Sequence, residues 1–305
     1  EVKCAPYGTC RRDTLQRYDQ HNMPAYTTTN GLASIFNEVK AQAKAKQYAL
    51  IVGCHGTGWL FSEGKSRART RYFGGSDHYF QTNIPTLAAA IEQAKMPMQF
   101  VMFDDCYMSN IEVAYEMRHA TNYLIGCCSE IMAYGMPYKN IWKYLIQQKP
   151  NYQAVVNEFH QFYSNYQWPY GNIGVTDCSK VEEVVAHMKT INAATAKKAN
   201  LIDWEDVQRL DGYEKTIFFD MGDYVNKLCT TPETQALARN LHTALAQLVP
   251  YKSTTPYIYT ALEELSYNRI RVNAYSGITI SDPTQSDFEK ALTTKKATGW
   301  WKATH

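Results

Sequence analysis

The stretch YALIVGCHGTGW, residues 48–59, decides how we expect the chain to fold. Its first six residues form a short, continuous apolar block, which is typical of a strand that is covered on both faces in a parallel sheet. The apolar positions between Gly31 and Lys46 follow helical spacing, so an amphipathic helix is expected before the strand. A helix that leads directly into a buried strand is the repeating unit of α/β folds.

The same unit repeats along the chain. Further apolar strands are predicted over residues 99–104, 123–128 and 173–177, and helices begin before the first two of them, near Asn83 and near Asn110. Residues 179–182, with the sequence SKVE, predict a capping box at the start of another helix. Strands that alternate with helices at these lengths indicate an α/β domain with a mainly parallel sheet.

The pattern changes after about residue 200. A capped helix that ends at Leu248 is predicted there, and short segments rich in tyrosine and threonine follow it, as at residues 257–260. We expect residues 1–200 to form the main α/β domain. We expect residues 201–305 to form a smaller α+β extension that packs on it.

The composition argues against two classes of partner. With 45% hydrophobic residues, 20% charged residues and a formal net charge of +2, the chain has no basic excess that would favour nucleic acid. No stretch approaches the roughly 20 apolar residues that cross a bilayer, so no membrane span is expected. The eight cysteines include no CxxC pair, so no metal site of the zinc type is predicted.

Two chemically reactive residues follow neighbouring predicted strands. His55 follows the strand of residues 48–53, and Cys106 follows the strand of residues 99–104. Active sites of parallel sheets lie beyond the carboxyl ends of the strands, so the two side chains are expected to face each other at one rim. A lone His or Cys is more often structural. Together they favour a thiol nucleophile with an imidazole base.

Cys106 needs other groups to act as a nucleophile, because an ordinary thiol is only a few per cent ionised at neutral pH. His55 is the expected base. A helix that begins just after Cys106 is expected to supply part of a positive field through its free N–H groups. Gly56 lets the backbone approach a substrate carbonyl, and the N–H groups of Gly56 and Cys106 are the predicted oxyanion hole.

The residues around these two positions carry a resemblance to a known family. The motif YALIVGCHGTGW ends an apolar block in His-Gly, and FVMFDDCYMSNIEVAYEMR, residues 100–118, contains a second block that ends in Asp-x-Cys. Both resemble the signature of the clostripain family of cysteine peptidases, which belongs to the caspase-like clan. The resemblance continues through CCSEIMAYGMPY, residues 127–138, to SGITISDP, residues 276–283. It implies a caspase-like three-layer sandwich, with helices on both sides of a mainly parallel sheet and the catalytic residues within residues 1–200.

The resemblance implies a cysteine endopeptidase that cleaves after Arg or Lys and forms an acyl-enzyme. Cys106 matches the family nucleophile, and His55 matches the general base and acid. Asp104 matches the acidic specificity pocket, and strand alternation places it on the face of Cys106 while Asp105 points to the other face. The alternative role for Asp104 is to cap the following helix. The rival hypothesis is a catalytically silent caspase-like scaffold that binds peptides or protein partners.

The specificity pocket departs from the family pattern at one position. The family commonly places a second Asp in a Gly-Asp-Gly-type turn, whereas this chain has Tyr134 there. One carboxylate instead of two weakens the binding of a cation, and the loss is largest in a dry pocket. Ser129 and Glu130 match the family's pocket wall; their alternative is a solvated exit of the strand.

A basic loop, KSRARTR at residues 65–71, lies between the two motifs. One interpretation is a solvated loop. The other follows from the resemblance, since family members are often activated by self-cleavage in this region, and it predicts a zymogen that is processed at Arg67, Arg69 or Arg71.

The remaining expectations rest mainly on the resemblance. The partner is a peptide or protein substrate, the sequence requires no cofactor, and calcium is the ion that some relatives need. A secreted, periplasmic or surface-attached location is implied. Residues 1–30 do not look like the family's opening strands, so these strands are expected to be divergent or to lie on a separate N-terminal chain from processing. Because the sequence starts with Glu1 and not Met, a leader, a pro-segment or a larger piece is expected before it.

Overall fold

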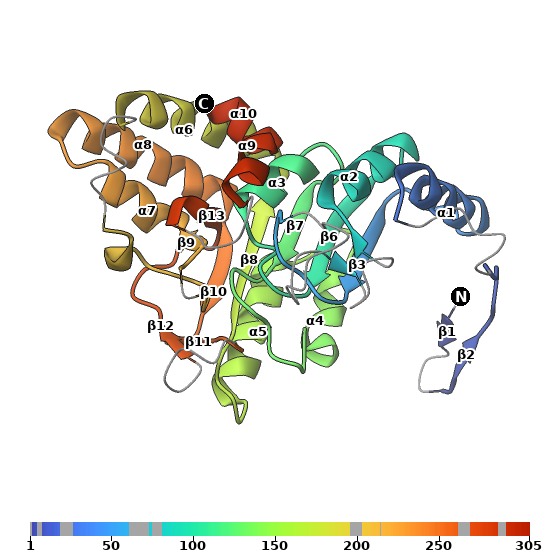
Figure 1. Ribbon diagram of the computed structural model, residues 1–305. Coiled ribbons are helices and arrows are strands. Elements are labelled where there is room, and N and C mark those ends of the chain that lie inside the picture. The colour runs from blue at the N-terminus through green and yellow to red at the C-terminus, as the bar shows by residue number, and fades with distance from the viewer. Residues whose placement is uncertain are drawn as a thin grey trace.

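A computed structural model gives the structure of the protein. It describes residues 2–4, 8–18, 27–60, 73–74, 81–195, 203–213, 215–261, 269–285 and 291–305. Figure 1 shows a central sheet with helices packed around it.

In the described part of the chain, the central sheet has five strands in the order β10-β8-β7-β6-β3. They are β3 (Tyr48–Gly53), β6 (Met98–Asp104), β7 (Tyr123–Gly126), β8 (Asn172–Asp177) and β10 (Tyr251–Thr254). β3, β6 and β7 pair in parallel, whereas β8 runs antiparallel to both β7 and β10. β10 therefore points the same way as β3, β6 and β7, and the sheet is mainly parallel, as predicted.

The reversed direction of β8 follows from how the chain enters it. α4 (Tyr138–Leu145) and α5 (Tyr152–Asn165) follow β7. The chain then pairs Gly174 of β8 with Gly126, the last residue of β7. The chain thus re-enters the sheet at the carboxyl end of β7, whereas a parallel strand requires a crossover to the opposite end.

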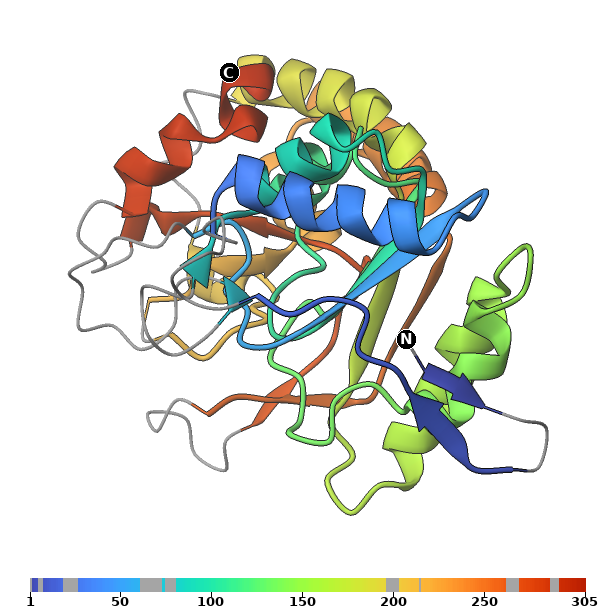
Figure 2. The ribbon, with the colours of Figure 1, turned by 90° about the vertical axis from the view of Figure 1, so that its right-hand side faces the viewer.

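Helices cover both faces of the sheet and make three layers (Figure 2). One face carries α1 (Thr29–Gln42), α2 (Ile84–Gln93), α3 (Ile111–Met117), α6 (Val181–Thr195) and α8 (Pro232–Leu248), and the other carries α4 and α5. Within β6, Val101 and Phe103 belong to the apolar core of the first face, and Phe100 and Met102 belong to the core of the second. A continuously apolar strand therefore serves two cores, because its side chains alternate.

Shorter elements complete the described structure. The strand pairs are β1 (Val2–Cys4) with β2 (Cys10–Arg12), β4 (Phe73–Gly74) with β5 (Gln81–Thr82), β9 (Phe218–Asp220) with β13 (Thr279–Ser281), and β11 (Tyr257–Tyr259) with β12 (Arg269–Arg271); the helices are α7 (Met221–Leu228), α9 (Ala291–Ala297) and α10 (Gly299–Thr304). The segment after residue 200 contacts the main sheet, because β10 forms its edge and α8 packs on α6. The division into residues 1–200 and 201–305 stays a prediction.

The start of α6 differs from the capping box predicted over residues 179–182. The carboxylate of Asp177 accepts hydrogen bonds from the N–H of Ser179 at 3.0 Å and from its hydroxyl at 2.7 Å. A 3₁₀ turn over Cys178–Lys180 follows, and α6 begins at Val181. The last residue of β8 therefore caps the turn, since a carboxylate is a strong acceptor for free N–H groups.

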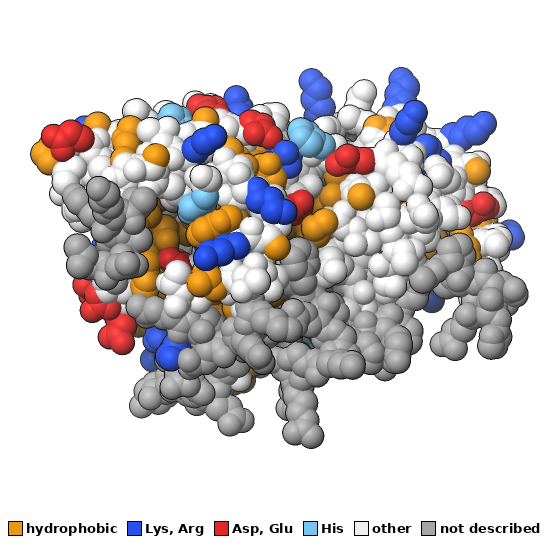
Figure 3. Space-filling model, turned by 45° about the horizontal axis from the view of Figure 1, so that its top comes forward, with side chains coloured by type: hydrophobic (Ala, Val, Ile, Leu, Met, Phe, Trp, Pro, Cys, Tyr) orange, Lys and Arg blue, Asp and Glu red, His pale blue; other side chains and the backbone are white. Residues whose placement is uncertain are grey.

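The surface agrees with a chain of nearly balanced charge. On the face that Figure 3 shows, Lys and Arg side chains are interspersed with Asp and Glu. Of the described helices, none is long and apolar enough to cross a membrane.

Candidate active site

A pocket of about 680 Å³ lies at the carboxyl ends of β3 and β6, and we call it the Cys106 pocket. It brings together most of the residues that the sequence singled out: His55, Gly56, Asp104, Cys106, Glu130 and Tyr134. The rest of its described lining is Gly53, Cys54, Tyr107, Ile131, Met132, Ala133, Gly135, Tyr213, Tyr259 and Ala261.

Two neighbouring strands bring His55 and Cys106 to the same pocket. β3 pairs in parallel with β6 to the end of both strands. The alignment goes one residue further, because the Cys54 thiol lies 3.5 Å from a carboxylate oxygen of Asp105. His55 and Cys106 are the next residues along the two segments, and both line the pocket. The His55 side chain is exposed, and Cys106 is half-buried.

Gly56 packs directly against Asp105 and Cys106. A Cβ atom at Gly56 would lie 2.5 Å from the carbonyl oxygen of Cys106 and 2.7 Å from Cγ of Asp105. Real Cβ contacts are longer, so any larger residue forces the two segments apart. Glycine is therefore needed here for the close approach of the segments that carry His55 and Cys106.

Asp105 is buried beneath this contact and is not part of the described lining. Its Oδ2 atom accepts a hydrogen bond from the Cys54 thiol, while its Oδ1 atom has no hydrogen-bond partner in the described structure. Burial raises the pKa of Asp105 well above its usual range; the Cys54 hydrogen bond opposes the rise, and Asp104 adds to it. The shift disfavours the charged form of Asp105, and any charge that Asp105 does carry raises the pKa of the Cys106 thiol.

Burial also dominates the ionisation of Cys106. It raises the pKa of the thiol to about 12. A hydrogen bond with the backbone of Ile131 opposes the rise, and nearby carboxylates, Glu130 first, add to it. The thiol form prevails at neutral pH, so attack by this sulfur requires a base within reach, and His55 lines the same pocket.

The helix after Cys106 starts near Asn110, as the sequence indicated. The chain first bends, with Tyr107 at a φ of 64°, and α3 begins at Ile111. The side chain of Asn110 accepts hydrogen bonds from two N–H groups of the first turn, at 3.1 and 3.2 Å. The predicted start of this helix is confirmed, and the field that it contributes at the Cys106 thiol stays a prediction.

Asp104 lines the pocket and is also hydrogen-bonded to the segment that follows residues 132–135 of the lining. Its carboxylate accepts hydrogen bonds from the Met136 N–H at 2.8 Å and from the Tyr138 hydroxyl at 2.6 Å. Gly135 packs on the same carboxylate, since a Cβ atom there would lie 2.6 Å from Oδ1. A carboxylate has about four acceptor positions, so roughly two remain for a ligand. Asp104 does not cap the following helix, because Asn110 occupies that position.

Glu130 and Ser129 follow β7 and have different surroundings. Glu130 lines the pocket and accepts hydrogen bonds from the Tyr107 hydroxyl at 2.9 Å and the Ala261 N–H at 3.0 Å. Burial raises the pKa of Glu130. Ser129 is buried behind the described lining, and its hydroxyl accepts a hydrogen bond from Asn172. The alternative that these two residues simply lie in solvent where the strand ends therefore does not hold.

Some residues of the site were missed by sequence reasoning, and some lie outside the described residues. Tyr213, Tyr259 and Ala261 line the pocket from segments after residue 200. No local motif marks them, because long-range packing alone brings them to the strand ends. The predicted processing residues Arg67, Arg69 and Arg71 lie outside the described residues.

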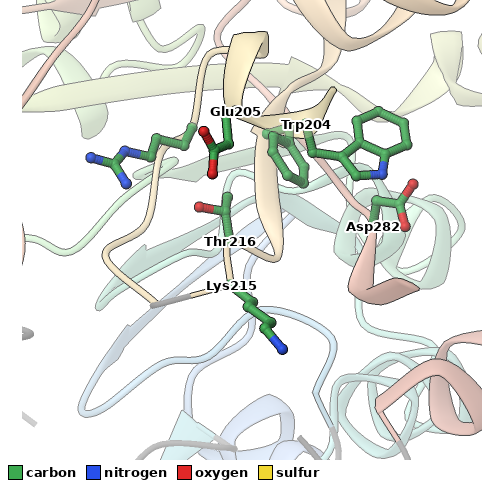
Figure 4. A pocket seen from close by; sticks show the side chains of 7 residues that line it. Trp204, Glu205, Lys215, Thr216 and Asp282 are labelled. Atoms are coloured by element: carbon green, nitrogen blue, oxygen red, sulfur yellow. The ribbon is translucent and has the colours of Figure 1, made fainter. Parts of the chain in front are cut away.

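A second pocket, of about 610 Å³, has a different lining, and we call it the Trp204 pocket (Figure 4). It is lined by Trp204, Glu205, Arg209, Lys215, Thr216, Phe219 and Asp282. Charged and aromatic groups meet there, but none of these described residues is a Cys or a His. Within the described ranges, no group of three or more His, Cys, Asp or Glu residues is arranged to hold a metal ion.

The fold and the Cys106 pocket together define a class of protein. A three-layer α/β sandwich, with a thiol and an imidazole at the ends of neighbouring parallel strands, is the architecture of a caspase-like cysteine peptidase. A model of the clostripain family matches residues 11–283. The chain belongs to the clostripain family and is a cysteine endopeptidase.

Solved structures support this assignment. The chain is similar to iotapain, a secreted C11 cysteine protease from Bacteroides thetaiotaomicron, with 42% identity and a TM-score of 0.86 over 99% of this chain and 83% of that chain. It is similar to a clostripain from B. thetaiotaomicron in complex with the peptide inhibitor BTN-VLTK-AOMK, with 43% identity and a TM-score of 0.66 over 77% of this chain and 99% of that chain.

A third similar structure is an inactive zymogen C11 protease from Parabacteroides distasonis, with 28% identity and a TM-score of 0.79 over 100% of this chain and 82% of that chain. No curated protein matches the chain. The predicted family and the predicted caspase-like α/β fold are confirmed.

Proposed function

We propose that this endopeptidase cleaves peptide bonds after Arg or Lys, with Cys106 as the nucleophile and His55 as the general base and acid. One observation carries the proposal: both side chains line a single pocket with the carboxylate of Asp104, at the ends of adjacent strands. A nucleophile, its base and an anionic partner for a basic side chain are then within reach of one bound peptide.

The proposed reaction begins with proton transfer from Cys106. His55 removes the thiol proton as the sulfur attacks the scissile carbonyl carbon. A base is needed for this step, because burial raises the pKa of the thiol to about 12 and so keeps it protonated. The N–H groups of Gly56 and Cys106 stabilise the oxyanion, and His55 gives its proton to the leaving amine. The acyl-enzyme that remains is hydrolysed by a water molecule that His55 deprotonates.

The proposed specificity rests on the two carboxylates that line the pocket. Asp104 binds the basic side chain with its remaining acceptor positions, and Glu130 adds negative charge. Ser129 supports the wall beside Glu130, and Tyr134 forms part of the rim. The peptide of the inhibitor bound to the B. thetaiotaomicron clostripain, VLTK, ends in lysine. A bound cation also offsets negative charge near Cys106 and so favours the thiolate.

We further propose a zymogen that acts outside the cytoplasm and is processed at Arg67, Arg69 or Arg71, and whose opening strands are divergent or lie on a separate N-terminal chain. The similar proteins support this, since one is a secreted protease and another is an inactive zymogen. The family resemblance adds a calcium requirement as a hypothesis. Activity after treatment with EDTA, with and without added Ca²⁺, tests it.

Cleavage of a peptide library tests the proposed reaction, with Cys106→Ala and His55→Ala as matched variants. We expect cleavage after Arg and Lys by the unchanged protein and a loss on the order of 10⁴-fold in each variant. Cleavage after other residues contradicts the specificity, and activity retained in Cys106→Ala contradicts the nucleophile. A protein that binds the peptides but cleaves none of them supports the silent scaffold.

A further inference from the structure

Tyr107, the residue after Cys106, has an uncommon backbone conformation. Its φ of 64° lies in the left-handed region, which glycine adopts readily and a bulky residue rarely does. Such a conformation persists where the surrounding structure holds it, and it is often found at functional sites. Because Tyr107 and Cys106 share a peptide bond, the groups that hold Tyr107 also help to place the Cys106 thiol.

Two aromatic rings pack against the Tyr107 ring. The centroid of the Phe218 ring lies 5.0 Å from that of Tyr107, with the planes 16° apart. The centroid of the Tyr213 ring lies 6.4 Å away, with the planes 29° apart. Both distances are typical of stacked aromatic pairs. All three residues are buried, and we call their rings the Tyr107 stack.

A single buried carboxylate, that of Asp211, orders the segment that carries two of these rings. Asp211 is 1% exposed. Its Oδ1 atom accepts a hydrogen bond from the Tyr213 N–H at 3.0 Å. Its Oδ2 atom accepts hydrogen bonds from the Ile217 N–H at 2.9 Å and the Phe218 N–H at 2.6 Å. One side chain therefore holds the backbones of both Tyr213 and Phe218.

The Tyr107 stack also contacts the segment that carries His55. Gly58 follows His55 closely in the chain, and a Cβ atom there would lie 3.2 Å from the Phe218 ring and 3.2 Å from the carbonyl oxygen of Tyr107. The backbone at Gly58 is thus packed directly on the stack. The same rings therefore lie against both segments that lead to the reactive pair.

The hydrogen bonds to Asp211 favour its charged form. Burial raises the pKa of Asp211 to about 7; the three N–H groups oppose this rise, and the charge of Arg209 opposes it to a smaller extent. An amide at this position keeps one acceptor oxygen but replaces the other with an NH₂ donor. Asp211→Asn therefore breaks part of this set of hydrogen bonds with little change in volume.

We propose that Asp211 is a positioning residue for the nucleophile: by holding Tyr213 and Phe218 against Tyr107, it fixes the backbone that presents the Cys106 thiol to the substrate. This inference rests on the proposed role of Cys106. Asp211 is not part of the described lining of the Cys106 pocket, so it acts through the stack. A displacement of about 1 Å at a reacting atom can lower a rate on the order of 100-fold, even when the changed residue is remote from the chemistry.

Cleavage of a fluorogenic peptide with Arg before the scissile bond tests the proposal. Asp211→Asn is compared with the unchanged protein at about pH 8.5, where the carboxylate of Asp211 is ionised. We expect kcat to fall about 10- to 100-fold and KM to stay within about threefold. The reason is that the thiol is displaced while Asp104 and Glu130 still line the pocket.

Asp282→Asn is the matched control. Asp282 is also a buried carboxylate, and it accepts hydrogen bonds from the Tyr224 hydroxyl at 2.7 Å and from the N–H and the hydroxyl of Thr284 at 3.0 and 2.7 Å. Neither of these partners belongs to the Tyr107 stack. We expect both variants to unfold at a lower temperature and only Asp211→Asn to lose kcat. An equal fall of kcat in the two variants overturns the inference.

Phe218→Leu is the second variant, because it removes a ring of the stack and keeps the N–H that Asp211 binds. We expect kcat to fall about tenfold in this variant. Adding Asp211→Asn to it is expected to lower kcat by less than about threefold further, since both changes act through the same contact. Two losses that multiply in full overturn the route through the stack.

The remaining outcomes separate this inference from the function on which it rests. If Asp211→Asn does not fold, an unchanged kcat in Phe218→Leu overturns the inference. A loss in Asp211→Asn that falls on KM alone also overturns it, because substrate binding is then affected and not the thiol. Each of these results leaves the proposed function intact. Cleavage that persists in Cys106→Ala removes the proposed function as well.

Discussion

The Cys106 pocket and the Trp204 pocket are similar in volume, about 680 and about 610 Å³, and both have charged and aromatic linings. They differ in what positions their side chains. The first is lined by residues at the ends of β3 and β6, and the pairing of these two strands determines where those residues lie. The second is lined by a 3₁₀ turn over Trp204–Asp206, the short strand β9 and connecting segments. The comparison teaches that volume and charge do not distinguish the two pockets, whereas a thiol and an imidazole line only the first of them.

The largest effect is expected where the two reactive segments touch. Gly56→Ala places a methyl group 2.5 Å from the Cys106 carbonyl oxygen, so the segments must separate and the proposed oxyanion hole loses its geometry. We expect kcat to fall on the order of 10²- to 10³-fold with little change in secondary structure by circular dichroism. Activity within a few fold of the unchanged protein would show that the close approach is not needed.

Removing one negative charge from the Cys106 pocket is expected to have the next largest effect. Asp104→Asn keeps the shape but leaves a bound cation without its charged partner. We expect kcat/KM on Arg and Lys peptides to fall about 30-fold or more. The matched control is Glu205→Gln in the Trp204 pocket, which removes the same charge from the other site. Equal losses in the two variants would contradict a local role for Asp104.

The ionisation of Cys106 gives a pH test. Since burial raises the pKa of its thiol to about 12, the reactive thiolate is scarce at neutral pH and increases with pH. In a Cys54→Ser variant, alkylation of Cys106 by iodoacetamide should accelerate about tenfold per pH unit between pH 7 and 10, followed by mass spectrometry. A plateau near pH 8 would mean that the thiol is ionised more easily than its burial indicates.

The smallest effect is expected in the Trp204 pocket. Arg209→Ala removes a charged side chain that lines it. Away from the reactive groups, such a change is expected to leave kcat/KM within about twofold and the unfolding free energy within about 0.5 kcal/mol. A loss comparable with that of Asp104→Asn would show that this pocket also takes part in substrate binding.

The sequence predicted the parts of the fold that depend on local pattern. The apolar blocks of β3 and β6 were evident from their residues, and the site followed because reactive residues come directly after them. The direction of β8 could not be predicted, because a run of apolar residues is the same read in either direction. The cap formed by Asp177 was missed, since several polar residues near Ser179 can cap equally well on sequence alone.

The candidate site was predictable only as far as it is built from strand ends. His55, Cys106 and Asp104 follow from strand positions and the family motif. Tyr213 and Tyr259 come from distant segments, and nothing in their local sequence connects them with the pocket. Their placement depends on how the segment after residue 200 packs, which periodicity does not specify.

Covalent labelling of the pocket tests most directly whether Cys106 is the nucleophile. A peptide electrophile that ends in Arg should modify the protein once, at Cys106, as located by mass spectrometry. Cys54 is the matched control, because its thiol is also half-buried and lines the same pocket. We predict full labelling of Cys54→Ser, none of Cys106→Ala, and much slower labelling of His55→Ala. Labelling that persists in Cys106→Ala and disappears in Cys54→Ser would contradict the assignment of Cys106 as the nucleophile.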